Sequence, residues 1–96
     1  MHAVVRNYSG AGAKELADLL EERKPEIETL IGSVTGLVMY SFVRSDGGCF
    51  TVTICQDKTG ADQSIQIARD WIQENAADLS VNPPAISEGS VILQVT

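Results

Sequence analysis

The chain has 96 residues and a formal net charge of −6 at pH 7, and 21% of its residues are charged. An acidic chain lacks the basic surface that nucleic acids and anionic membranes require, so we expect neither as a partner. No apolar run approaches the ~20 residues of a membrane span, and the first residues lack the pattern of a signal peptide. We therefore expect one cytoplasmic domain that spans residues 1–96.

A first strand is predicted from Ala3 to Tyr8. Side chains alternate along a strand, so they divide between the two faces of a sheet. This places Val5 and Asn7 on one face, and Val4, Arg6 and Tyr8 on the other.

A helix is predicted after the break at Ser9 to Gly12, because apolar residues recur at helical spacing from Leu16 to Ile31. Pro25 interrupts this pattern, since a proline inside a helix lacks the N–H group and its ring clashes with the carbonyl group of Glu21. We expect either one helix that is kinked at this point or two short helices that share a direction.

Two β-rich runs flank the sequence Ser45-Asp46-Gly47-Gly48, which indicates a β-hairpin. The first run is apolar at nearly every position, and this is typical of a strand that is covered on both faces. In the first strand we expect Leu37, Met39 and Val43 on one face, and Val38, Tyr40 and Phe42 on the other. In the second strand we expect Phe50, Val52 and Ile54 on one face, and Cys49, Thr51, Thr53 and Cys55 on the other.

A second long helix is predicted to begin near Thr59, whose hydroxyl group we expect to cap it. Its apolar stripe runs from Ala61 to Leu79, with Trp71 beside the stripe. A last strand is expected from Ala85 to Val95, with a bulge at Gly89.

The order of elements is therefore β-α-β-β-α-β. Helices and strands match in length, so both helices fit along one face of a four-stranded antiparallel sheet, the ferredoxin-like α+β arrangement. The opposite face stays mostly apolar, and such a patch exceeds what monomers usually expose. We expect a homodimer whose sheet faces pack together or form a shared barrel.

The chain resembles a known group at this point. The residues that carry the resemblance are Gly36-Leu37-Val38-Met39-Tyr40, with a glycine four residues before a tyrosine, and Ala68-Arg69-Asp70-Trp71-Ile72 in the second helix. They resemble the dimeric α+β barrel superfamily and, within it, the antibiotic biosynthesis monooxygenase-like group. The resemblance covers nearly the whole chain. It implies a homodimer and a pocket between sheet and helices, in a group that includes cofactor-free oxygenases of polycyclic aromatic substrates.

The resemblance also allows a comparison with haem-degrading relatives, which use an asparagine on the first strand, a tryptophan on the second helix and a histidine soon after it. Asn7 and Trp71 match the first two in placement, but the only histidine of the chain is His2. The cofactor-free oxygenases have an asparagine one turn before the tryptophan, where this chain has Ile67. We therefore expect no cofactor, and the resemblance identifies no catalytic residue.

The candidate ligand-pocket residues are Asn7, Trp71, Tyr40 and Thr51. Trp71 is either a core anchor or a wall that stacks on a planar ligand. The two cysteines lie in one strand, too far apart for a disulfide, and a Cys/His zinc site is excluded by the single histidine. We expect no metal.

Two functions remain open from the sequence. In the first, a small homodimer binds a small apolar or aromatic molecule or acts as a cofactor-free monooxygenase. The alternative is a non-catalytic regulatory or structural ligand-binding module, as in the amino-acid-sensing domains that share this topology.

Overall fold

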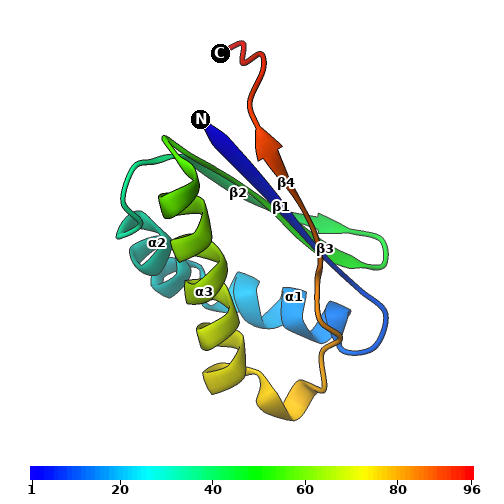
Figure 1. Cartoon of the computed structure of the whole chain (residues 1–96). Helices are drawn as coiled ribbons and strands as arrows, with labels where there is room; N and C mark the ends of the chain where they lie inside the picture. The colour runs from blue at the N-terminus through cyan, green and yellow to red at the C-terminus, as the bar shows by residue number, and fades with distance from the viewer.

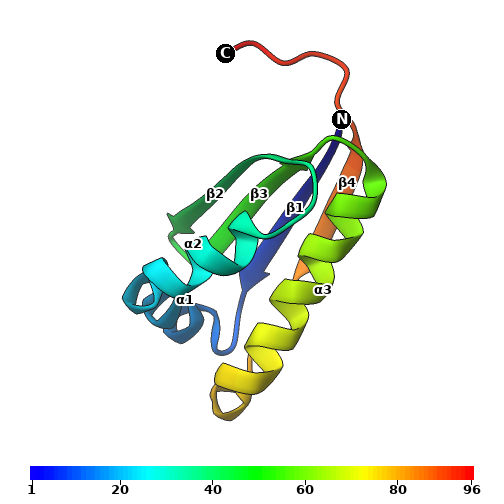
Figure 2. The ribbon, with the colours of Figure 1, turned by 90° about the vertical axis from the view of Figure 1, so that its left-hand side faces the viewer.

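The computed structural model describes all 96 residues. Four strands form one antiparallel sheet in the order β2-β3-β1-β4: β1 (His2–Ser9), β2 (Leu37–Ser45), β3 (Gly48–Cys55) and β4 (Ala85–Ser90). Three helices and one 3₁₀ turn connect them: α1 (Ala13–Glu22), α2 (Lys24–Gly32), α3 (Lys58–Asn75) and η1 (Ala77–Leu79). All helices lie on one face of the sheet, and no element covers the other face (Figures 1 and 2). The predicted ferredoxin-like α+β fold is confirmed.

The helical segment around Pro25 consists of two short helices rather than one kinked helix. Arg23 joins them, because its N–H donates to the carbonyl of Leu19 at 3.0 Å while its own carbonyl accepts from Ile27 at 3.1 Å. Pro25 falls in the first turn of α2, where the missing N–H leaves no helical hydrogen bond unmade.

The strand pairing fixes which side chains lie under the helices. The faces of β1 and β3 are as predicted, because Val4, Arg6 and Tyr8 pair with Thr53, Thr51 and Cys49 on the covered side. The prediction for β2 was wrong at Leu37. An irregularity between Leu37 and Met39 shifts the alternation, so that Leu37 lies with Tyr40 and Phe42 on the helix side.

Two element ends also differ from the prediction. The side chain of Asp57, rather than Thr59, caps α3 by accepting the N–H of Gly60 at 3.3 Å. β4 stops at Ser90, and Gly89 pairs in regular register without a bulge. Just beyond β4, Val91 still donates its N–H to the carbonyl of Met1, at 2.9 Å.

The hydrophobic core lies between β1, β3 and the helices. It is formed by the buried residues Tyr8, Ala13, Leu16, Ala17, Leu20, Cys49, Trp71 and Ala76. Gly60 lets α3 approach the loop before β2 closely, because a Cβ atom there would collide with the carbonyl oxygen of Thr35. None of the helices combines the length and the apolar character that crossing a membrane would need.

Candidate functional site

A cleft runs between the sheet and the helices. The centre of this cleft has a volume of about 30 Å³. The β4 groove, about 400 Å³ and lined by Arg6, Tyr8 and Arg69, opens on one side between α3 and the segment that leads into β4. The β2 groove, about 560 Å³ and lined by Lys24, Glu28 and Tyr40, opens on the other side between α2 and β2. The centre shares Arg6 and Tyr8 with the first groove and Tyr40 with the second, so the three spaces adjoin.

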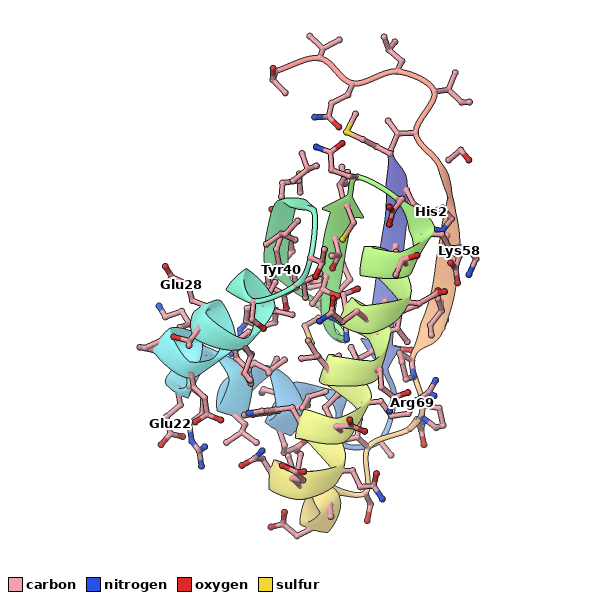
Figure 3. All side chains as sticks on the ribbon, turned by 60° about the vertical axis from the view of Figure 1, so that its left-hand side comes forward. His2, Glu22, Glu28, Tyr40, Lys58 and Arg69 are labelled. Atoms are coloured by element: carbon pink, nitrogen blue, oxygen red, sulfur yellow. The ribbon has the colours of Figure 1, made fainter.

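The structure brings three of the four candidate residues together. Trp71, Tyr40 and Thr51 all line the centre of the cleft, although they come from α3, β2 and β3. Figure 3 shows Tyr40 between β2 and the helices. Asn7 lies apart from them, because it is exposed on the open face of β1. Within one chain, Asn7 does not line the cleft.

Arg6 is the residue at the centre of the cleft that the sequence interpretation did not select. Only 3% of it is exposed, its Nε atom has no hydrogen-bond partner, and none of the ion pairs of the chain includes it. A buried guanidinium group is always charged, and burying it without a counterion is costly. The available signal was the alternation of β1, which places an arginine on the same covered face as Val4 and Tyr8.

Two phenol groups lie near this guanidinium. Burial raises the pKa of Tyr8 and of Tyr40, and the positive charge of Arg6 opposes the rise in both. Both phenols are therefore protonated at neutral pH and are available as hydrogen-bond donors. The hydroxyl group of Thr51 is also buried and has no partner.

One hydrogen bond fixes the indole ring of Trp71, and a second involves only its backbone. Its indole N–H donates to the carboxylate of Glu26 on α2, and its carbonyl accepts the side-chain N–H of Asn75 at 2.9 Å. The hydrogen bond from Trp71 is the main reason why the pKa of Glu26 lies below its usual value. The indole ring is thus both a part of the core and a fixed wall of the cleft.

The cleft combines one cation and several hydroxyl groups with apolar walls. Ten of the 12 residues around its centre are hydrophobic. Such a site suits a mostly apolar molecule that presents an anionic oxygen to Arg6. His2 lies away from the cleft and bonds Glu88 at 2.8 Å (Figure 3). No group of three or more His, Cys, Asp or Glu side chains is arranged to hold a metal ion.

The unpaired charge leads to a stability prediction. Replacing Arg6 with methionine removes the charge and keeps much of the side-chain volume, so we expect the free energy of unfolding to rise by about 1–2 kcal/mol. Urea denaturation followed by the fluorescence of Trp71, the only tryptophan, measures this change.

Arg44→Met is the matched control for this substitution. Arg44 is an exposed arginine that pairs with Asp18 at 2.9 Å, so its loss should lower the free energy of unfolding by at most about 1 kcal/mol. A larger loss in Arg6→Met than in Arg44→Met would show that the guanidinium group supports the fold.

The chain was compared with known proteins. Neither a family model nor a curated protein matches its sequence. Among solved structures, a protein of unknown function from Nitrosomonas europaea is 21% identical, with a TM-score of 0.71 over 99% of this chain and 91% of that one. A dimeric ferredoxin-like protein from an uncultured marine organism is 16% identical, with a TM-score of 0.63 over 98% and 94%.

A third similar structure is a monooxygenase from the gene ActVA-Orf6 of Streptomyces coelicolor, in complex with the ligand nanaomycin D. It is 16% identical, with a TM-score of 0.63 over 99% of this chain and 89% of that one. Likeness at this level of identity concerns the fold. The chain therefore shares the ferredoxin-like α+β fold of these structures.

Proposed function

We propose that the protein binds a hydroxylated aromatic molecule in the cleft and oxygenates it without a bound cofactor. The observation that carries the proposal is Arg6, a buried cation that has no counterion and faces an apolar space next to two protonated phenols. A ligand with an ionised oxygen supplies the missing partner and forms a charge-assisted hydrogen bond. The monooxygenase of similar fold, solved with nanaomycin D, supports this substrate class.

The chemistry requires a substrate that can form its own carbanion, such as an anthrone. Loss of one methylene proton to water in the groove leaves a negative charge that spreads to the ring oxygen, where Arg6 stabilises it. The carbanion forms a C–O bond with O₂, and protonation gives a hydroperoxide. Loss of the second methylene proton and cleavage of the O–O bond then give a ketone and water.

The overall change is CH₂ + O₂ → C=O + H₂O. The carbon supplies all four electrons that reduce O₂, so the balance closes without a further reductant. Tyr8 and Tyr40 hold their protons at neutral pH because burial raises the pKa of each. In the proposal they donate a hydrogen bond to the departing hydroxide, and Trp71 and the apolar residues keep water from the intermediate.

Oxygen uptake with 1,8-dihydroxyanthrone tests the proposal. We expect the protein to accelerate the uptake of one O₂ per anthrone over buffer. Arg6→Met should lower kcat/KM by about 10²-fold, as for loss of one oxyanion donor, while Arg44→Met keeps the native rate. No acceleration, or equal rates in Arg6→Met and the native protein, would contradict the oxygenase. Binding without oxygen uptake would favour the non-catalytic ligand-binding module instead.

We further infer that two copies pair through the open faces of their sheets. The larger half-buried apolar side chains on that face are Val5, Met39, Phe50, Val52 and Ile54. The segment after β4 runs beyond the end of the sheet (Figures 1 and 2), and Ile92, Leu93 and Val95 in it are 93%, 81% and 85% exposed. A second copy would remove both apolar surfaces from water. The ferredoxin-like relative described as dimeric supports the pairing.

Native mass spectrometry tests this association. We expect the mass of two chains for the native protein at micromolar concentration, and the mass of one chain for Val52→Glu, because a carboxylate would be buried unpaired between the faces. Ala77→Glu adds the same charge at an exposed position on the helix side and should remain a dimer. A native protein with the mass of one chain would rule the dimer out.

A further inference from the structure

The β4 groove contains positive charge that no acidic side chain of the chain balances. Arg6 and Arg69 both line it, and no aspartate or glutamate does. Neither arginine takes part in any ion pair. Asp70, next to Arg69 in the sequence, accepts a hydrogen bond from Gln66 at 2.8 Å. Two unpaired arginines in one groove are unexpected in a chain whose net charge is −6.

The two guanidinium groups act on the same part of the groove. Burial raises the pKa of Tyr8, and the charges of Arg6 and Arg69 both oppose the rise. Arg69 lies on the side of α3 toward the segment that leads into β4 (Figure 3). Positive charge therefore lies at two points of the groove: on Arg6 at its floor and on Arg69 at its outer edge.

The wall opposite α3 is rigid. Asn82 donates its backbone N–H to the carbonyl of Ala11 at 3.3 Å, and the fixed rings of Pro83 and Pro84 follow. With a volume of about 400 Å³, the groove falls within the range of pockets that bind small molecules. The groove is thus large enough for a small molecule that reaches from Arg6 to the surface.

The β2 groove differs in charge. It is larger, at about 560 Å³, but Lys24 and Glu28 contribute one charge of each sign to its lining. An anion gains no net attraction from such a pair. Charge therefore distinguishes the two openings of the cleft, and size does not favour the β4 groove.

We propose that the β4 groove selects hydroxylated aromatic acids, with the ionised ring oxygen on Arg6 and a carboxylate at the outer end of the molecule on Arg69. The inference rests on the proposed function, and it adds the substrate class and the specificity-determining residue. Arg69 suits the carboxylate because its planar guanidinium group can donate two parallel hydrogen bonds.

Rhein and aloe-emodin test the role of Arg69. Both are dihydroxyanthraquinones, and they differ only in a carboxylate that replaces a hydroxymethyl group. Quenching of Trp71 fluorescence reports binding, because Trp71 lines the centre beside the groove. We expect the native protein to bind rhein about fivefold more tightly than aloe-emodin, as for one partly exposed ion pair.

Arg69→Gln should bring the two affinities together without changing that for aloe-emodin. Lys24→Gln is the matched control, since it removes one positive charge from the other groove and should keep the preference for rhein. The preference should also shrink as KCl is added.

The outcomes separate the two proposals. Equal affinities in the native protein, or a preference for rhein that persists in Arg69→Gln, would overturn the role of Arg69 while leaving the cleft as a binding site. If neither compound quenches Trp71, the proposed function falls together with this inference.

Discussion

A guanidinium group without a counterion lies where the sheet meets the helices, and the properties of the cleft depend on it. Arg6 is on β1, a strand that pairs on both sides with β3 and β4. Its backbone cannot move toward water without breaking the sheet, so its charge must remain between the layers. A buried charge without a partner makes the folded protein less stable than an apolar residue at the same position would. Binding an anion recovers that interaction, which connects the fold to a function.

The break between α1 and α2 creates the space around this charge. α1 carries core residues such as Leu16 and Ala17 and contributes Leu20 to the lining of the cleft centre, whereas α2 contributes three lining residues, Ile27, Leu30 and Ile31. Pro25 lies in the first turn of α2, so a new helix begins shortly before the residues that α2 contributes to the cleft. The hydrogen bond from Trp71 to Glu26 then ties α2 to α3. A single proline and a single side-chain bond thus shape the helical wall above Arg6.

Much of the fold follows from local patterns in the sequence. The hairpin at Asp46-Gly47, the faces of β1 and β3 and the element order are all set by turn residues and alternation. The irregularity at Leu37 was not predictable, because an apolar run without alternation gives no signal of a register shift. The end of β4 depends on where β1 begins, which is a pairing between distant segments.

Residue type led to some of the residues that line the cleft, but not to Arg6 or Arg69. Tyr40, Thr51 and Trp71 were chosen by residue type and do line one cleft. Asn7 was chosen by resemblance. The alternation of side chains along β1 places it on the open face of the sheet, whereas Arg6 and Tyr8 lie on the covered face. Arg69 could not be identified from the sequence, because its significance lies in the absence of acidic neighbours around a groove that only the folded chain forms.

The central claim is that Arg6 stabilises an anionic oxygen inside the cleft. Alizarin changes its visible absorption when its phenol ionises, so a pH titration of the bound dye measures the pKa of that phenol directly. Burial alone would raise this pKa, and a facing guanidinium would lower it. The account predicts a pKa at least about one unit lower in the complex with the native protein than with Arg6→Met. An equal or higher pKa in the native complex would contradict it.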